Sequence, residues 1–362
     1  HIKENLSCII ILRGLNPIFP GQIKDELTGF KGNKNPIKFN VTDDHIKILK
    51  DWTFINVLRE ESILKQYKDM MGESTAGKQF KLEGGKGRSA NLAGIKPELC
   101  NLYICEGKSA AENINLRIQL EKDGLDYNGV IGLKGKLINT SKIKIENLAK
   151  NEEILSIIKM LGLELGVDYS IDENFLKLNY HKVYIVSDAD DDGAHIAGLI
   201  INFFSLFPTL LDRVFLFQLM TSMIRAIKKK ENKIEYVAKF YSKKECEEWK
   251  KVNNTRGIKF KYYKGLGTSN KDVVKDDLMG ENPAPLVSLR IDKQSAELIT
   301  ILFEKSILRR KKWFQKMKNE QIDLKLYALK KSGPFHIIKK VEGKTHRDIT
   351  HMLESDLLRF FL

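Results

Sequence analysis

The sequence has few cysteines, few prolines and no long apolar run, and these scarcities exclude several classes of protein. Its 362 residues include four cysteines, with no C-x-x-C pair or other metal-like spacing, which argues against a disulfide scaffold and suits a reducing compartment. The longest nearly apolar stretch spans residues 196–207 and contains Asn202 and Ser205, whereas a membrane helix needs about 20 apolar residues. We therefore expect no membrane-spanning segment and no membrane partner. Because the chain starts at His1 rather than Met, we interpret it as an excerpt of a longer protein.

Positive charge is in excess. Lys and Arg number 61 against 47 Asp and Glu, for a net charge of +14, which favours a polyanionic partner such as nucleic acid. A lysine-rich genome that inflates every surface is the alternative explanation. With 42% apolar and 30% charged residues the chain is able to bury a core, and its length fits about two domains at roughly 150 residues each.

The order of predicted elements indicates two parts. Residues 7–12 resemble a short buried strand, and a helix is predicted from Asp44 to about Met71. The glycine-rich basic stretch 82–89 marks a domain boundary. After it, strands and helices alternate, which predicts an α/β fold with a mostly parallel sheet covered on both faces. The predicted elements are a strand at 102–105, a helix after Ser109, a strand and turn at 131–137, a helix at 154–161 ending at Gly162, a strand at 183–186, an apolar helix from about Ala194 to Phe207 stopping at Pro208, strands at 234–241 and 259–263, and then a basic helix.

The densest group of chemically active residues is D-A-D-D-D-G at 188–193, directly after the predicted strand 183–186. In extended backbone Asp188, Asp190 and Asp192 share one face, where three carboxylates repel unless a cation lies between them. Oxygen ligands at the carboxyl end of a parallel strand suit Mg²⁺. The segment does not fit an EF-hand calcium loop, because its twelfth position is Leu199 instead of the glutamate ligand and a strand instead of a helix precedes it. A solvated acidic turn that caps the next helix remains an alternative.

A second strand, 102–105, also ends in a carboxylate and a glycine, Glu106 and Gly107. In one parallel sheet Glu106 is expected to lie beside the aspartates. A glutamate next to an Asp-x-Asp pair makes a divalent-metal site with a spare acid or base. That combination suits phosphodiester chemistry.

Five ordered segments resemble those of one family, the type IIA DNA topoisomerases in their eukaryotic and viral branch. E-G-x-S-A at 106–110 and D-x-D-x-D-G-x-H-I at 188–196 resemble its TOPRIM domain. Residues 132–139 are similar to P-L-R-G-K-x-L-N, and 261–269 to K-Y-Y-K-G-L-G-T-S. Residues 16–24 look like the Q-T-K loop of the transducer domain. The resemblance implies a Rossmann-like TOPRIM sheet, the end of an α+β transducer domain and a basic helical lead-in to a winged helix.

The resemblance also implies roles for individual residues. Glu106, Asp188 and Asp190 are the expected Mg²⁺ ligands and catalytic residues, with Asp192 in support or on a second ion; Mn²⁺ or Ca²⁺ is expected to substitute. Glu106 is expected to exchange a proton with the DNA 3′-oxygen. The expected contacts to DNA are Lys136, Asn139, Lys264, Arg310 and Lys311, and the expected contacts to ATP are Gln22, Ile23 and Lys24. His195 is interpreted as a first-turn helix residue that packs on the acidic loop rather than as a metal ligand.

The resemblance also implies domain limits, a reaction and partners. Residues 1–80 are expected to end the transducer domain, 98–220 to form the TOPRIM core, 221–330 its extension, and 331–362 the start of the winged-helix cleavage region. The implied reaction is ATP-driven passage of double-stranded DNA through a paired break, by a homodimer or by a split enzyme with a separate cleavage subunit. An intracellular location follows, in the nucleus of a eukaryote or in the host cytoplasm or virion of a virus.

Three departures from the family's sequence pattern leave alternative functions open. Lys108 stands where topoisomerases have aspartate, and we expect its ammonium to lower the pKa of Glu106 and to compete with the metal. Ser222 replaces a usual proline, which predicts a looser turn. None of the 11 tyrosines follows an arginine, so the attacking tyrosine is expected elsewhere, on the partner protomer. An intact enzyme, a split enzyme and a catalytically impaired DNA-binding module are all compatible with these features.

Overall fold

The chain was analysed as a computed structural model, which divides into two compact units, residues 1–69 and 70–362. The structure describes residues 16–24, 27–31, 42–50, 52, 55, 57–58, 61–62, 64–65, 68–69, 72, 74–77, 87–143, 145–148, 150–188, 190–219, 221–230, 233–241, 243–263, 272–273, 276–277, 286–291, 294–304, 307–319, 339–341 and 344–353. Within these ranges no helix is long and apolar enough to cross a membrane.

The first unit contains a small antiparallel hairpin and a helix. Strands β1 (Pro17–Ile18) and β2 (Gly29–Phe30) pair, with Thr28 N–H donating to the Ile18 carbonyl at 3.0 Å. Helix α2 (Asp43–Lys50) starts one residue before the predicted Asp44, and helical residues recur up to position 69. The strand predicted at 7–12 lies outside the described residues.

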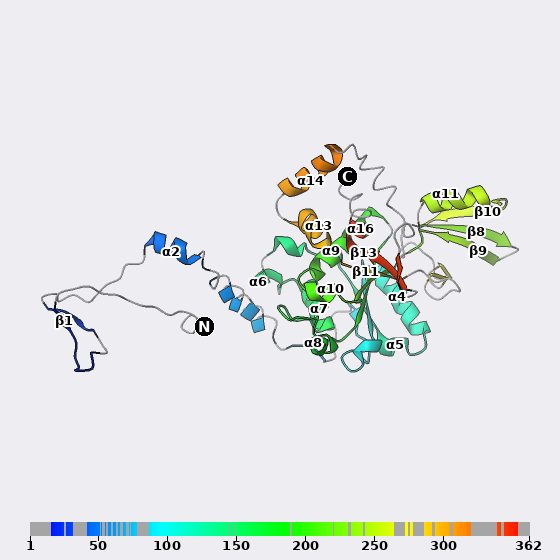
Figure 1. The fold of residues 1–362 in the computed structure, drawn as a ribbon. Helices are drawn as coiled ribbons and strands as arrows, with labels where there is room; N and C mark the ends of the chain where they lie inside the picture. Colours follow the sequence, from blue (N-terminus) through cyan, green and yellow to red (C-terminus); the bar gives the residue numbers. More distant parts are fainter. Residues whose placement is uncertain are drawn as a thin grey trace. The chain divides into compact units, whose positions relative to one another are not determined.

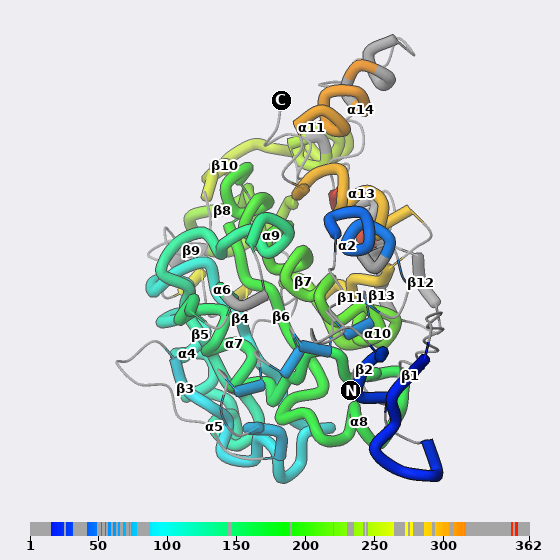
Figure 2. The backbone as a smooth tube through the Cα atoms, turned by 90° about the vertical axis from the view of Figure 1, so that its left-hand side faces the viewer, coloured from blue at the N-terminus to red at the C-terminus, as the bar shows by residue number. Residues whose placement is uncertain are grey.

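The second unit is built on an eight-stranded sheet in the order β12-β13-β11-β7-β6-β4-β5-β3 (Figure 2). The four central strands, β5, β4, β6 and β7, are parallel, which confirms the predicted α/β fold. The strands are β3 (Gly87–Arg88), β4 (Asn101–Cys105), β5 (Asn128–Gly132), β6 (Lys182–Val186), β7 (Leu216–Leu219), β11 (Leu286–Arg290), β12 (Lys339–Val341) and β13 (Lys344–Asp348).

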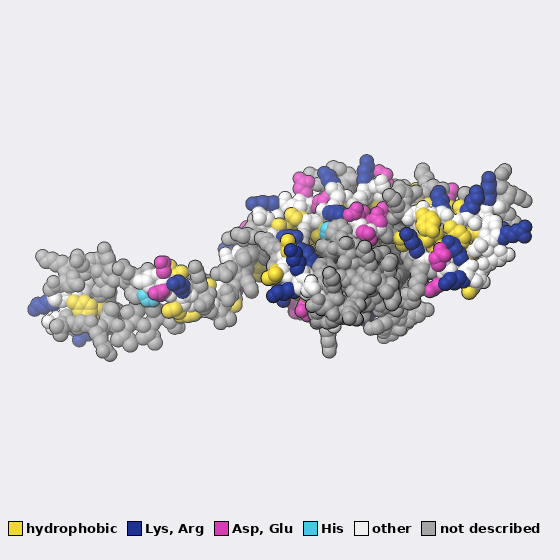
Figure 3. All heavy atoms as spheres, turned by 90° about the horizontal axis from the view of Figure 1, so that it is seen from above, with side chains coloured by type: hydrophobic (Ala, Val, Ile, Leu, Met, Phe, Trp, Pro, Cys, Tyr) yellow, Lys and Arg dark blue, Asp and Glu magenta, His cyan; other side chains and the backbone are white. Residues whose placement is uncertain are grey.

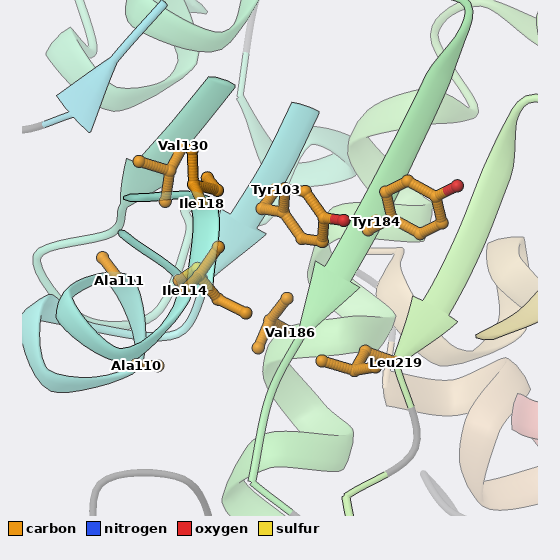
Figure 4. Packing of buried hydrophobic residues seen from close by; sticks show 10 residues of the cluster. Tyr103, Ala110, Ala111, Ile114, Ile118, Val130, Tyr184, Val186 and Leu219 are labelled. Carbon is orange, nitrogen blue, oxygen red and sulfur yellow. The ribbon is translucent and has the colours of Figure 1, made fainter. Parts of the chain in front are cut away.

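Helices cover both faces of this sheet (Figure 1). On one face lie α4 (Lys108–Leu120) and α5 (Gly124–Tyr127), and on the other α7 (Glu152–Leu161), α9 (Asp191–Phe204) and α10 (Pro208–Leu211). Strands β4 and β6 are apolar at almost every position because both of their faces are buried. Under α4, Ile114 and Ile118 pack on Tyr103 and Tyr184, whose rings stack at 4.9 Å (Figure 4).

Helix boundaries follow local capping. Asn151 caps α7 by accepting from Ile154 N–H at 3.0 Å, and α7 ends at Gly162 in the left-handed region (φ +70°), as predicted. The apolar helix α9 begins three residues before the predicted Ala194 and ends at Phe204. Pro208 begins α10 instead of merely stopping α9. Other helices in the described ranges are η2 (Pro97–Leu99), η3 (Thr140–Lys142), α6 (Ile145–Leu148), α8 (Asp172–Leu176), α13 (Ser295–Phe303), α14 (Ile307–Asn319) and α16 (Ile349–Met352).

A separate three-stranded antiparallel sheet, in the order β10-β8-β9, stands beside the large one with α11 on one face (Figure 1). Its elements are β8 (Ile224–Lys230), β9 (Lys233–Phe240), α11 (Lys243–Val252) and β10 (Ile258–Tyr262), close to the two predicted strands. Trp249 of α11 packs against Phe240 and Phe260 of the strands, with ring centroids 5.5 and 6.2 Å away.

A buried charge network joins Arg225 and Lys239 of this small sheet to Asp276 and Asp277. Arg225 is fully buried and pairs with both aspartates, and Lys239 Nζ lies 2.8 Å from Asp276 Oδ2. Arg225 Nε also donates to Ser222 Oγ at 3.1 Å. Each buried charge therefore has an opposite charge beside it, as burial requires.

Candidate functional site

The carboxyl ends of β4 and β6 bring Glu106 next to the acidic loop. The two strands are parallel neighbours, with Cys105 opposite Val186, and Glu106 N–H donates to the Val186 carbonyl at 2.9 Å. Asp188 N–H in turn donates to Glu106 Oε2 at 2.8 Å. The predicted adjacency is thus confirmed. Because β5 and β6 flank β4 on opposite sides, this edge is the topological switch point, where open α/β sheets form their crevice.

The loop between β6 and α9 is folded tightly. Asp190 is the N-cap of α9, and its Oδ1 accepts from Gly193 N–H at 2.9 Å. A Cβ on Gly193 would lie 2.1 Å from the Asp188 carbonyl oxygen, so only glycine fits there. The prediction that Asp188, Asp190 and Asp192 share one extended face is wrong for Asp192, because this cap starts the helix at Asp191 and places Asp192 in its first turn.

Lys136 reaches this loop from the turn after β5. Gly135 precedes it with φ +119°, a conformation that L residues with a side chain rarely adopt. The Lys136 ammonium lies 2.6 Å from Asp192 Oδ1, and both side chains are largely solvent-accessible. We call Glu106, Asp188, Asp190, Asp192 and Lys136 the acidic site. On the face seen in Figure 3, acidic side chains gather near the middle of the second unit with basic side chains around them.

The charges of the acidic site act on one another. Burial raises the pKa of Glu106, the Asp190 and Asp192 carboxylates raise it further, and the Asp188 N–H and Lys136 oppose this rise. A hydrogen bond from Lys136 holds the pKa of Asp192 below its ordinary value. Burial, together with Lys136, lowers the pKa of His195 to about 4, so this imidazole is neutral at pH 7. His195 lies in the first turn of α9, as interpreted from the sequence.

Lys108 does not take part in the acidic site. As the first residue of α4 it extends into solvent, with 91% of its side chain exposed, and its ammonium lies 3.8 Å from Glu112. The expectation that Lys108 lowers the pKa of Glu106 is wrong, since that pKa is raised and the lysine that acts on it is Lys136. The neighbour in sequence points away because a helix directs its side chains outward, whereas the turn at Gly135 directs a distant lysine inward.

The donor set fits a hard cation in its chemistry. Carboxylates from two strand ends stand at one sheet edge, and burial together with the Asp190 and Asp192 carboxylates raises the pKa of Glu106, a rise that a bound cation would oppose. In the described part of the chain, however, no three His, Cys, Asp or Glu side chains lie close enough together to hold a metal. Asp190 is engaged with the Gly193 N–H and Asp192 with Lys136, so a cation would compete with these two contacts.

The predicted DNA contacts lie in different settings. Asn139 is engaged within the protein: its amide donates to the Phe303 carbonyl at 2.8 Å and its Oδ1 accepts from Ser141 N–H. Arg310 donates to the Leu302 carbonyl at 2.5 Å, and Lys311 is exposed on α14. Lys264 lies outside the described residues. Contact of any of these with DNA stays a prediction.

The predicted ATP contacts belong to the first unit. Gln22, Ile23 and Lys24 lie in the exposed loop between β1 and β2, with Ile23 87% exposed. Lys24 has φ +57°, which is uncommon for lysine. An ATP contact here also stays a prediction.

Comparisons with known proteins agree with this geometry. Residues 101–245 match the family model of the Toprim domain, and 219–336 match that of the C-terminal associated domain of TOPRIM. DNA topoisomerase 2 of Caenorhabditis elegans is 34% identical over 337 residues, which cover 91% of this chain and 21% of that protein. The chain is homologous to a region of the type II DNA topoisomerases. It spans about a fifth of the length of its curated topoisomerase relatives.

Other relatives support the same family. Human DNA topoisomerase 2-beta is 31% identical over 335 residues, covering 91% of this chain and 20% of that protein. A solved structure of the Plasmodium falciparum topoisomerase II DNA-binding, cleavage and re-ligation domain matches with a TM-score of 0.61 and 25% identity, covering 78% of this chain and 36% of that one. The present chain therefore contains a region homologous to a topoisomerase cleavage and re-ligation domain.

Sequence reasoning missed one buried residue that binds the turn following Lys136. Asn202 is fully buried in α9 and binds three residues of the 139–141 turn. The available signal was a lone amide within the otherwise apolar stretch 196–207, because a buried polar side chain needs partners.

Proposed function

We propose that this chain supplies the acidic, metal-dependent half of a DNA cleavage and re-ligation centre in a type II topoisomerase. One observation carries the proposal: the Asp188 N–H donates to the Glu106 carboxylate, so two strand ends about 80 residues apart in sequence form one acidic site at the sheet's switch point. The titles of the relatives, a topoisomerase 2 and a DNA cleavage domain, support it.

Glu106, Asp188 and Asp190 would hold Mg²⁺, with Asp192 in support. When bound, the ion supplies charge stabilisation at the oxygens of the reacting phosphodiester. Glu106 is suited to proton exchange with a 3′-oxygen, because burial and nearby carboxylates raise its pKa and so make it a better proton acceptor than an ordinary carboxylate. Lys136 is suited to a DNA phosphate, since its ammonium is partly exposed and already beside an anion. A tyrosine from a partner protomer would attack the phosphodiester.

Charge supports DNA as the partner. The chain carries +14, and helix α14 presents Arg309, Arg310, Lys311 and Lys312 in succession. The proposed wider setting follows the family: ATP contacts at Gln22 and Lys24, a homodimer, and the domain limits given above. A catalytically impaired module was suggested by Lys108, but that side chain points away from the acidic site. We therefore favour the metal-dependent reading.

Metal binding tests the proposal directly. We expect Glu106→Gln and Asp188→Asn each to weaken Mn²⁺ or Mg²⁺ binding to the 362-residue chain at least about tenfold by isothermal titration calorimetry, because each removes an anionic oxygen donor. Asp191→Asn is the matched control, since it removes the same charge from the same loop outside the proposed ligand set, and we expect a change of about twofold or less. Equal affinities for Asp188→Asn and Asp191→Asn would contradict the proposed ligands.

A further inference from the structure

Segment 136–141 runs along helix α9 and is attached at both ends. At one end Lys136 pairs with Asp192 in the first turn of α9. At the other end residues 139–141 bind Asn202 near the end of α9. Asp192 and Asn202 are ten residues apart, about 15 Å along a helix, so the two attachments lie toward opposite ends of α9.

The two attachments differ greatly in burial. The Lys136–Asp192 pair is exposed, and exposed ion pairs hold their partners weakly. Asn202 is fully buried. Its Nδ2 donates to Asn139 Oδ1 at 3.1 Å and to Thr140 Oγ1 at 2.9 Å, and its Oδ1 accepts from Ser141 Oγ at 2.6 Å. The buried end therefore fixes where the segment lies.

The main chain of Asn202 adds to this attachment. Its carbonyl is in the last turn of α9, where carbonyls have no partner within the helix. The Thr140 hydroxyl donates to it at 3.0 Å and the Ser205 hydroxyl at 2.6 Å. Thr140, which is buried, thus closes the helix end and holds the turn at once.

The same turn reaches the end of α13. Asn139 Nδ2 donates to the carbonyl of Phe303, the last residue of α13, and Arg310 of α14 donates to the neighbouring Leu302 carbonyl. Asn202 is thus connected through one side chain, Asn139, to the helix end from which the basic helix α14 follows.

We infer that Asn202 is a positioning residue that sets the place of Lys136 over the acidic site and of the α13 end that leads into α14. It acts through Asn139, Thr140 and Ser141 and touches neither the carboxylates nor α14. The inference deepens the proposed function and rests on it for the role of Lys136 in DNA binding. The geometric part stands on the hydrogen bonds alone.

Amide hydrogen exchange of the full 362-residue chain tests the geometric part. We expect Asn202→Ala to speed exchange about tenfold or more at residues 141–143, whose N–H groups donate within the turn, because the buried attachment is lost. Asn179→Ala is the matched control: Asn179 is also buried and donates to two carbonyls, of Thr75 and Met160, but lies outside this network. We expect the control to change exchange at 141–143 by less than about twofold.

A second pair of variants covers the case in which Asn202→Ala does not fold. Thr140→Val and Ser205→Ala each remove one hydroxyl that donates to the Asn202 carbonyl, and Thr140 alone belongs to the segment. We expect Thr140→Val to speed exchange at 141–143 and Ser205→Ala to leave it unchanged. Equal effects within either pair would overturn the inference.

Binding of a DNA duplex of about 30 base pairs tests the link to Lys136. We expect Asn202→Ala and Lys136→Ala each to weaken binding, and the loss in the double variant to be smaller than the sum of the two single losses, since Asn202→Ala already displaces Lys136 and adds only its effect through α14. Additive losses would overturn the link. If the wild-type chain binds no duplex, the proposed function fails, while the exchange result still decides the positioning role.

Discussion

The acidic site and the buried charge network gather the same kinds of side chain and treat them in opposite ways. In the network two cations face two carboxylates, and Arg225 is fully buried. In the acidic site the carboxylates outnumber the one lysine, and Asp192 and Lys136 are open to solvent. Charges that cancel internally stabilise structure, whereas uncancelled charges at a sheet edge remain available to a ligand.

The largest effect is expected from breaking the network. Arg225→Met leaves Asp277 buried without its guanidinium, which typically costs about 3–5 kcal/mol of unfolding free energy. Urea unfolding followed by circular dichroism measures the loss. Arg309→Met is the control, because Arg309 is mostly exposed where it pairs with Glu304 and about 1 kcal/mol or less is expected. If the loss of unfolding free energy is no larger than that of the control, the network stabilises the fold no more than an exposed ion pair does.

The same variant has a pH signature. Burial alone would raise the pKa of Asp276, but Lys239 and Arg225 outweigh it and hold that pKa below its ordinary value. A depressed carboxyl pKa stabilises the fold above the unfolded value, about 4, and this contribution is lost as pH falls through the folded pKa. The difference between wild type and Arg225→Met should therefore shrink below about pH 4.

Ser222 sharpens the comparison with a smaller change. Its hydroxyl accepts from Arg225 Nε and lies 3.4 Å from Asp277 Oδ2, so Ser222→Ala should cost about 1 kcal/mol in the same urea experiment. Ser156→Ala, which removes an exposed hydroxyl bonded to the Glu152 carbonyl, should cost close to nothing. Equal losses of unfolding free energy for Ser222→Ala and Ser156→Ala would mean that the Ser222 hydroxyl does not stabilise the network.

Removing Lys136 tests the uncancelled side of the comparison. Lys136→Ala should tighten Mg²⁺ binding about two- to fivefold in calorimetric titrations, because the competing ammonium at Asp192 is gone. Lys108→Ala removes the same charge from a residue that points into solvent and should leave the affinity unchanged. Tighter binding by both variants would indicate a general effect of net charge instead of a specific one.

The smallest effect is expected from Glu106 without metal. A carboxyl with a raised folded pKa costs stability when ionised, at pH above both pKa values, and costs none below the unfolded value. Glu106→Gln keeps an acceptor for Asp188 N–H and should raise the melting temperature by about 1 °C at pH 7 and by nothing near pH 4. A lower melting temperature at pH 7 would mean that the charged hydrogen bond outweighs the repulsion.

The sequence predicted the central strands and the meeting of Glu106 with Asp188 because both depend on local rules: short apolar runs form buried strands, and parallel strands end at one edge. It did not predict the conformation of Asp192, because a three-residue cap decides it. It named the wrong lysine, since nearness in sequence is not nearness in space. The role of Asn202 required coordinates, because its partners lie about 60 residues earlier.

The packing of Trp249 has a practical consequence. The three tryptophans are Trp52 in the first unit, Trp249 in α11 and Trp313 in α14, and Trp249 stacks edge-on against Phe240 and Phe260 of the small sheet. The core of the large sheet under α4 contains two tyrosines, Tyr103 and Tyr184, instead of a tryptophan. Replacing Trp52 and Trp313 with phenylalanine would leave one intrinsic fluorophore, whose emission follows the small sheet while far-ultraviolet dichroism follows the whole chain. The unfolding of the small sheet could then be compared with the unfolding of the whole chain in one sample.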